Sequence, residues 1–501
     1  SQQIGVLPCN SCKMGKKKKP ESKGKGALKT SMKTEKKNAM KLKKELSAIG
    51  EEDIKSLIAK SRSQDKSELI EEIINPGPRS NFTLSHHPER DEFYLFGGEY
   101  FDGKKTFMYN DLFCYELKSN TWKKISCPNP PSPRCSHQAV TTPSGGGQIW
   151  IFGGEFASPS QIQFYHFSDL YVFHLKEKRW EQINAKGGPS ARSGHRMALF
   201  RKYLVVFGGF HEAYKDFHYF NDVHLFDLTN RHWNVITVSG IPPCPRSGCQ
   251  LATVNDEKVL LYGGYTKQKQ KKDVDVGTIH SDMFCLTVDK NDETCSKWKW
   301  STVKQSGVKP PPRCSFGWVA AGNNKVYMFG GVWDNVQGEE EIKGTLYGDL
   351  FFLDVVKAHW YPVNVGKSCS ASQSTTSVSE NPGNSTVATS KGPGSGMASS
   401  GVCPAPRRNA ALVVKHNVLY VYGGVVEEGE KQLTLQDLHS VDLRKSDQWK
   451  VLIEPPKQAD WVGSDDDSDE GGDEMDTEEE PDSEDSSEED ADESDTMSVD
   501  D

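Results

Sequence analysis

The residues best suited to chemistry in this chain are Glu212, Asp216 and His218, which lie within one short segment. Carboxylate and imidazole groups together suit a first-row transition metal, but the same neighbours are common on surfaces that bind none. The sequence contains no His-Glu-x-x-His, no Gly-rich phosphate-binding loop and no nucleophile elbow. We therefore interpret the three residues as part of a surface loop, and predict no catalytic residue, metal or cofactor.

Histidine and cysteine residues give little further support for a reactive site. His137 and His195 each stand three residues after an arginine, and this repeated position predicts packing in the fold rather than ligation. The twelve cysteines are scattered, and the Cys-x-x-Cys from Cys9 to Cys12 has no second pair with which to complete a zinc site. We interpret the thiols as structural or incidental.

Arginine offers another possibility, because one arginine and one aspartate recur in each of six similar stretches. The arginines are Arg79, Arg134, Arg192, Arg246, Arg313 and Arg407, and the aspartates are Asp111, Asp169, Asp222, Asp282, Asp349 and Asp437. A ring of arginines could bind acidic or phosphorylated segments of a partner. Arginine–aspartate pairing is the simpler interpretation, because a feature shared by all repeats more often serves packing. Both interpretations remain open.

Two further recurring features indicate the elements that position these residues. A glycine pair ends an apolar run in every stretch, at Gly97-Gly98, Gly153-Gly154, Gly208-Gly209, Gly263-Gly264, Gly330-Gly331 and Gly423-Gly424. A tryptophan follows the aspartate, at Trp122, Trp180, Trp233, Trp360 and Trp449, with Trp298 and Trp300 further along in the fourth stretch. A repeat of about 50 residues with these marks resembles a kelch blade. The sequence therefore predicts an all-β fold, a six-bladed kelch β-propeller.

Each repeat supplies four short runs of alternating apolar and polar residues, which predict a four-stranded blade. In the first repeat these runs are 82–84, 92–96, 112–117 and 121–125. We expect the propeller to span 67–455, with blades at about 79–125, 134–183, 192–238, 246–303, 313–365 and 407–453. Residues 67–74 are a candidate outer strand. Whether they or residues 449–453 complete the last blade stays open.

The segments between each glycine pair and the following aspartate are 12 to 17 residues long. They leave the blades on one face, because successive strands of a meander reverse direction. Aromatic residues in the first three are typical interface anchors, although they could instead fold inward and cap the blades. The candidate anchors are Tyr100, Phe101, Phe107, Tyr109, Phe164, Tyr165, Phe217 and Tyr219.

Strongly charged segments flank the repeats, although the chain as a whole has a net charge of only −9. In the basic arm, 1–66, we expect disorder with a short helix over 42–58 and only non-specific contact with nucleic acid. Lys16, Lys17, Lys18 and Lys19 are a candidate importin-binding signal, the alternative being a solubilising tail. Met14 resembles a natural start, so we expect 1–13 to be an upstream translation artefact.

Two other segments lack the periodicity of the blades. Residues 366–402, rich in Ser, Thr, Gly and Asn, predict a disordered insertion. Residues 456–501 predict a disordered acidic tail, because 464–501 carry 22 acidic and no basic residues. Serines followed by acidic residues in this tail suit an acidophilic kinase; an unmodified solubility tail is the alternative.

The runs Phe-Gly-Gly-Glu-Tyr-Phe-Asp-Gly from Phe96 and Arg-Ser-Gly-His-Arg-Met from Arg192 resemble those of kelch domain-containing proteins. The resemblance implies a non-enzymatic intracellular protein, in the cytoplasm, the nucleus or both. We expect a monomeric scaffold for protein partners, with no membrane contact. One alternative is the substrate-recognition subunit of a ubiquitin ligase. The other is a metal-dependent specifier enzyme, whose iron-binding loop Glu212, Asp216 and His218 resemble, except that His218 follows Asp216 by two residues rather than four.

Overall fold

The computed structural model describes residues 37, 39–62, 69–213, 216–271, 274–289, 291–292, 294–336, 342–366, 374–377, 403–428 and 431–455. All of them belong to one compact unit, Ser1–Gly463. Residues 1–13, the lysine signal at 16–19 and the acidic tail 456–501 lie outside the described residues. Across the described ranges, no helix combines the length and apolar character needed to cross a membrane.

Six antiparallel sheets make up most of the described chain, and in each the four main strands follow one another in sequence from the innermost to the outermost. This arrangement confirms the all-β six-bladed propeller. Blade 1 consists of β2 (Thr83–His86), β3 (Glu92–Phe96), β6 (Leu112–Glu116) and β7 (Thr121–Ser126), and blade 2 of β8 (Gln138–Thr142), β9 (Gln148–Phe152), β12 (Leu170–His174) and β13 (Arg179–Ile183). Blade 3 consists of β14 (Arg196–Phe200), β15 (Tyr203–Phe207), β18 (Val223–Asp227) and β19 (His232–Asn234), and blade 4 of β21 (Gln250–Val254), β22 (Lys258–Lys271), β23 (Val274–Val288) and β24 (Lys297–Thr302). Blade 5 consists of β26 (Gly317–Ala321), β27 (Lys325–Phe329), β30 (Leu350–Asp354) and β31 (His359–Val363), and blade 6 of β33 (Ala411–Lys415), β34 (Val418–Glu428), β35 (Lys431–Asp442) and β36 (Lys450–Ile453).

Three blades carry a fifth strand at the outer edge. β1 (Leu69–Ile73) pairs antiparallel with β7 of blade 1. β20 (Thr237–Gly240) and β25 (Ser306–Gly307) pair parallel with β24 and β31. Blade 6 is completed by its own β36. Among the described strands, none is therefore exchanged between the first and last blades, and the ring closes through side chains.

Six buried hydrophobic clusters fill the six seams between neighbouring blades, including the seam between blades 6 and 1. The late tryptophan of each blade lies in the seam with the preceding blade. Trp233 of blade 3, for example, packs against Phe152 of blade 2, with ring centroids 5.6 Å apart. The corresponding buried residues elsewhere are Trp122, Trp180, Trp298, Trp300, Trp360 and Trp449. Burial between blades explains why the repeat requires a large apolar side chain here.

The segments after the glycine pairs form β-hairpins, and the expectation of loops was wrong in this respect. The added strands are β4 (Glu99–Phe101) with β5 (Thr106–Met108), β10 (Glu155–Ala157) with β11 (Phe164–His166), β16 (Phe210–Ala213) with β17 (Asp216–Tyr219), and β28 (Val332–Val336) with β29 (Ile342–Leu346). In blades 4 and 6 the long strands of the blade continue through the hairpin. Cross-strand aromatic pairs such as Tyr100 with Phe107 favour this arrangement.

One strand also forms within the segment predicted as a disordered insertion. β32 (Ser374–Ser377) pairs antiparallel with β29 of the blade 5 hairpin. The segment has no alternation of apolar and polar residues, because β32 consists of Ser and Thr alone. Backbone pairing with β29 therefore specifies this strand, and composition gave no signal for it.

The helical part of the chain lies before the propeller. Residues 39–49 are helical, and α2 (Ile54–Arg62) follows after a break that includes Gly50. Asp53 caps α2, because its Oδ1 accepts a hydrogen bond from the Lys55 N–H (2.9 Å). The single short helix expected over 42–58 is thus two helical stretches. A short 3-10 helix, η1 (Ser144–Gly146), joins β8 to β9.

Candidate partner-binding face

The arginine at the start of each blade is held by a carboxylate and a glycine carbonyl. In blade 2, Arg134 donates from Nη1 to Asp169 Oδ1 (2.6 Å) and from Nη2 to Asp169 Oδ2 (3.0 Å). Its Nη1 also donates to the Gly153 carbonyl (3.0 Å). The pairs Arg192–Asp222, Arg246–Asp282, Arg313–Asp349 and Arg407–Asp437 repeat this geometry. These arginine side chains are buried, so they stabilise the blades and offer no surface to a partner.

An aromatic ring covers the guanidinium in four of the blades. The ring centroids of Tyr109, Phe167, Phe220 and Tyr347 lie 4.3, 4.0, 4.0 and 3.6 Å from the Cζ atom of the arginine of their own blade. Each ring belongs to the residue two positions before the aspartate, which explains why aromatic residues recur there. Tyr109, a candidate anchor, therefore belongs to the fold.

In four blades the second glycine of the pair forms a backbone hydrogen bond to the next blade. The Gly98 N–H donates to the Arg134 carbonyl (2.9 Å), across the seam between blades 1 and 2. The same bond joins Gly154 to Arg192, Gly209 to Arg246 and Gly331 to Arg407. Gly97 has a φ of 71°, and a Cβ atom there would lie 2.7 Å from the Arg134 carbonyl oxygen. A side chain would thus be both strained and overlapping, so the first glycine is required.

A ring of turns surrounds the axis of the propeller, and the sequence analysis missed it. The residue two positions after each blade arginine has a φ between 53° and 61°. These residues are Asn81, Ser136, Gly194, Gly248, Ser315 and Asn409. Backbone hydrogen bonds join neighbours, as from Ser136 to Asn81 (2.9 Å) and from Gly248 to Gly194 (2.8 Å). The available signal was the restriction of this position to Asn, Ser and Gly, which suits a left-handed turn.

His137 and His195 lie beside this ring and serve packing. The His137 Nε2 lies 2.9 Å from Thr83 Oγ1, and its ring meets Phe96 edge to face. His195 meets Phe152 in the same way. Burial lowers the pKa of both imidazoles, that of His137 to about 3, so both stay neutral in neutral solution.

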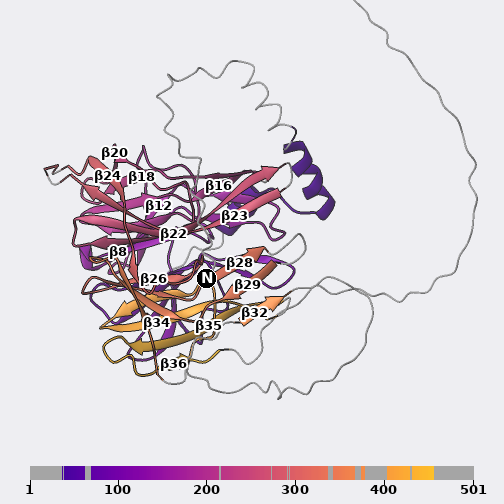
Figure 1. Ribbon diagram of the computed structural model, residues 1–501. Helices are drawn as coiled ribbons and strands as arrows, with labels where there is room; N and C mark the ends of the chain where they lie inside the picture. Colours follow the sequence, from indigo (N-terminus) through magenta and orange to yellow (C-terminus); the bar gives the residue numbers. More distant parts are fainter. Residues whose placement is uncertain are drawn as a thin grey trace, which may run out of the picture. The chain divides into compact units, whose positions relative to one another are not determined.

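The remaining candidate anchors lie on the hairpins, which project from one side of the blades (Figure 1). Phe107 and Tyr165 are 45% and 37% exposed. Tyr100, Phe101, Phe164, Phe217 and Tyr219 are partly buried. Ile162, Val276 and Trp333 add exposed apolar side chains from the hairpins of blades 2, 4 and 5. We call this set of hairpins the hairpin face.

α2 packs on the hairpins of blades 1 and 2. Ile54 and Ile58 form a buried cluster with Phe156 and Phe167. Gln163 fixes the start of the helix: its Oε1 accepts from the Ile54 N–H (3.1 Å), and its Nε2 donates to Glu51 Oε1 (3.0 Å) and to the Glu52 carbonyl (2.9 Å). The arm before the repeats therefore supplies part of the hairpin face, which composition alone did not indicate.

The three residues first considered for metal binding do not converge. They lie on the β16–β17 hairpin, where Glu212 pairs with Phe217 and His218 pairs with His211. Successive residues of a strand point to opposite sides, so Glu212 and His218 project from different faces of this hairpin. Within the described part of the chain, no group of three or more His, Cys, Asp or Glu residues could hold a metal ion.

Comparison with known proteins agrees with this architecture. Residues 79–293 match the family model described as FBX42, beta-propeller domain. The chain is 26% identical over 276 residues to Acyl-CoA-binding domain-containing protein 4 of Arabidopsis thaliana, covering 53% of this chain and 36% of the relative. It is 29% identical over 222 residues to Adagio protein 3 of the same plant, covering 43% and 32%. The matches thus span about a third of the length of these two relatives.

A third relative carries the name of an enzyme. The chain is 24% identical over 293 residues to the N-(sulfonatooxy)prop-2-enimidothioate sulfolyase of Thlaspi arvense, covering 57% of this chain and 79% of that protein. The described strands form a six-bladed β-propeller, and part of the chain is similar to the FBX42 propeller domain and to these relatives.

Proposed function

We propose that the protein is a non-enzymatic scaffold that binds protein partners on the hairpin face. The observation that carries the proposal is the exposure of large apolar side chains on hairpins of several blades, with Phe107, Tyr165 and Trp333 as examples. Exposed aromatic groups set on rigid strands are typical anchors of a protein interface, because a partner can desolvate them at little entropic cost. The partner's identity is left open by this proposal.

The structure changes which of the candidate anchors we favour. Phe217 and Tyr219 lie against Phe210, with ring centroids 6.2 and 5.8 Å apart, and Lys267 Nζ lies 4.8 Å from the Phe217 ring. Their replacement should therefore cost stability as well as any binding. Phe107 and Tyr165 are more exposed, although they meet the rings of Tyr100 and Phe167 (centroids 6.3 and 5.1 Å apart), so their replacement should affect binding more than stability.

The test compares the double variant Phe107→Ser with Tyr165→Ser against Val235→Ser. Val235 is 94% exposed and lies between β19 and β20, away from the hairpins, so it controls for loss of any exposed apolar group. We expect the double variant to lose most partners recovered by affinity purification of the full chain, with only a small fall in melting temperature, because both residues are exposed. Equal recovery of partners by wild type and the double variant would refute the proposal.

The proposal also includes a relationship to one particular kelch protein. The quoted runs are similar to kelch domain-containing protein 4, and we propose that relationship for the whole chain, together with a monomeric state, a location in the cytoplasm or nucleus, and importin binding through Lys16–Lys19. Fusion of residues 14–60 to a fluorescent protein tests the import signal. Loss of nuclear signal on replacing the four lysines by serine would support it, and retention would exclude it.

The second candidate function is substrate recognition for a ubiquitin ligase, which the match to the FBX42 propeller favours. Recovery of a cullin in the same purification would distinguish this role from a simple scaffold. The sulfolyase relative raises an enzymatic alternative. The opposite orientation of Glu212 and His218 argues against it, and metal analysis of the purified chain tests it.

A further inference from the structure

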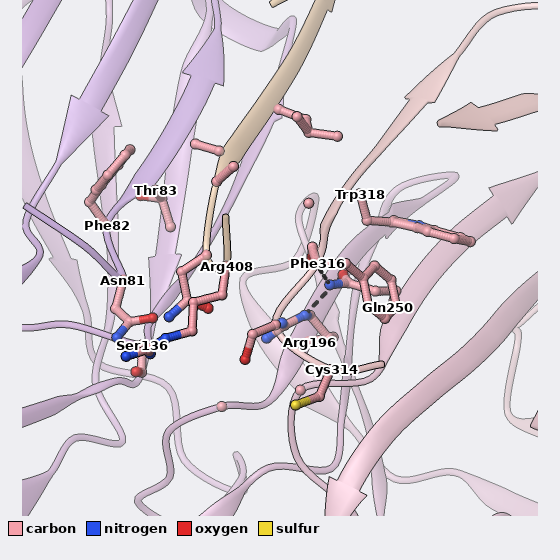
Figure 2. Close-up of a pocket in the computed structure, with 18 of the residues that line it drawn as sticks. Asn81, Phe82, Thr83, Ser136, Arg196, Gln250, Cys314, Phe316, Trp318 and Arg408 are labelled. Carbon is pink, nitrogen blue, oxygen red and sulfur yellow. Dashed lines mark hydrogen bonds between the residues drawn. The ribbon is translucent and has the colours of Figure 1, made fainter. Parts of the chain in front are cut away.

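The channel at the centre of the ring contains a cavity of about 690 Å³, lined by residues of all six blades (Figure 2). This volume is within the range of sites that bind small molecules. Arg196, Arg408 and Glu427 are the charged residues in its lining. The lining therefore carries one positive charge more than its carboxylate can balance.

The two arginines of the channel differ in their partners. Arg408 Nε donates to Glu427 Oε1 (3.2 Å), which balances its charge. Arg196, the first residue of β14, donates from Nε to Gln250 Oε1 (3.1 Å) and from Nη1 to the His195 carbonyl (2.9 Å). Both acceptors are neutral, and among the described residues no carboxylate lies within ion-pair distance of Arg196. Arg196 is partly exposed, and the partial burial of its guanidinium lowers its pKa.

Gln250 fixes the orientation of the Arg196 guanidinium. The Gln250 Nε2 donates to the Phe316 carbonyl (3.2 Å), so its Oε1 must face Arg196. Figure 2 shows this chain of hydrogen bonds from Arg196 through Gln250 to Phe316, with Arg408, Asn81 and Ser136 across the cavity. Two of the five guanidinium N–H groups are thereby used. Within the described part of the chain Nη2 makes no hydrogen bond, and it is not among the buried atoms that lack a partner, so its donors are accessible from the cavity that Arg196 lines.

We propose that Arg196 is the anchor of a binding site for a small anionic molecule in the channel, with a carboxylate or phosphate group as the part that it recognises. An oxyanion can accept hydrogen bonds from the accessible edge of the guanidinium and balance its charge. The site goes beyond the hairpin face, and it does not depend on any protein partner.

The test is isothermal titration calorimetry of the full chain with sodium phosphate and, separately, with sodium citrate at constant ionic strength. The variants are R196Q, R196K and the control R444Q, because Arg444 is an exposed arginine outside the channel. Wild type and R444Q should bind one molecule of one probe, and the probe that binds distinguishes phosphate from carboxylate recognition. R196Q should lose at least tenfold in affinity. R196K should lose less, because it keeps the charge without the planar fork.

Thermal melting gives a second readout. Without probe, R196Q should melt at or above the wild-type temperature, because the variant removes an unbalanced charge. Absence of saturable heat with both probes, or equal affinity of wild type and R196Q, would overturn the proposal. If R196Q does not fold, R196K decides: affinity equal to that of wild type would overturn the proposal, and a fall of threefold or more would support it.

Discussion

Blades 1 and 2 begin with the same kind of turn, yet they hold their arginines differently. Arg134 of blade 2 makes two short bonds to Asp169. Arg79 of blade 1 approaches Asp111 only to 3.6 Å, and the other oxygen of Asp111 binds Lys124 Nζ (2.8 Å). The Arg79 Nε is buried and has no hydrogen-bond partner in the described ranges. The repeat therefore specifies the arginine and the aspartate, while neighbouring residues such as Lys124 determine how closely the two side chains approach.

Blade 1 adjoins blade 6 on the side away from blade 2. The seam between blades 6 and 1, which we call the closing seam, joins parts of the chain that are distant in sequence. The buried Trp122 Nε1 and Tyr422 hydroxyl in this seam have no hydrogen-bond partner among the described residues. Polar contacts lie at its edge, where Lys415 Nζ donates to the His87 carbonyl (2.9 Å) and His416 meets Asp91 (2.6 Å). Unsatisfied buried polar atoms cost free energy, so these two groups weaken the closing seam.

The largest expected effect contrasts the two aspartates. Asp169→Ala should lower the free energy of unfolding by about 3–5 kcal/mol, because it leaves the buried Arg134 charge without a partner. Asp111→Ala should cost about 1–2 kcal/mol, because the Arg79 contact is longer and Asp111 is more exposed. Chemical unfolding of both variants measures the difference. Equal losses would show that the two blades hold their arginines equally firmly.

A second prediction concerns Glu155, which follows the glycine pair of blade 2 as Glu99 does in blade 1. Burial, and then the charge of Glu99, raises the pKa of Glu155 to about 8. The folded protein thus keeps a proton that the unfolded chain releases above about pH 4.5, so stability falls as pH rises between these values and levels off above them. Glu155→Gln should therefore gain about 2–4 kcal/mol over wild type at pH 9 and little at pH 4. Thermal melts at the two pH values check this, and a constant difference would contradict the assignment.

The smallest expected effect compares tryptophans in two seams. Trp298 in the seam of blades 3 and 4 donates from Nε1 to the Cys295 carbonyl (2.7 Å), whereas Trp122 in the closing seam has no acceptor. Trp298→Phe should cost about 1–3 kcal/mol, because it leaves a carbonyl unpaired. Trp122→Phe should cost less than about 1 kcal/mol, since the loss of packing is offset by removal of a buried donor. A larger loss for Trp122→Phe would remove the reason for calling the closing seam weaker.

The repeat made the fold predictable, because the glycine pairs and tryptophans recur at the same place in every blade. Gly97 needs a left-handed backbone, and Trp233 needs a large apolar seam. The segment that completes the last blade could not be predicted, since the outer strands of a blade carry no mark of the sheet they join. Residues 69–73 add to blade 1, although their offset from Arg79 matched that of an outer strand of the preceding blade.

The site was less predictable, because its contacts join residues far apart in sequence. The Ile54 N–H and Gln163 are 109 positions apart, and neither lies in a motif. Arg196 differs from the blade arginines only in lacking an aspartate nearby, which is a property of the folded ring. Aromatic composition did identify Phe107 and Tyr165, but it could not separate them from Tyr109, whose ring covers Arg79.

The docking of α2 has a practical consequence for any fragment of this protein. A fragment cut at Arg79, where the repeats begin, would keep every blade arginine but lose both α2 and β1. Phe156 and Phe167 would lose the cover of Ile54 and Ile58, and Gln163 would lose all three of its bonds to the helical segment. Such a fragment would expose an apolar patch that α2 covers in the full chain. Proteins that bind this patch in an affinity purification would be false positives.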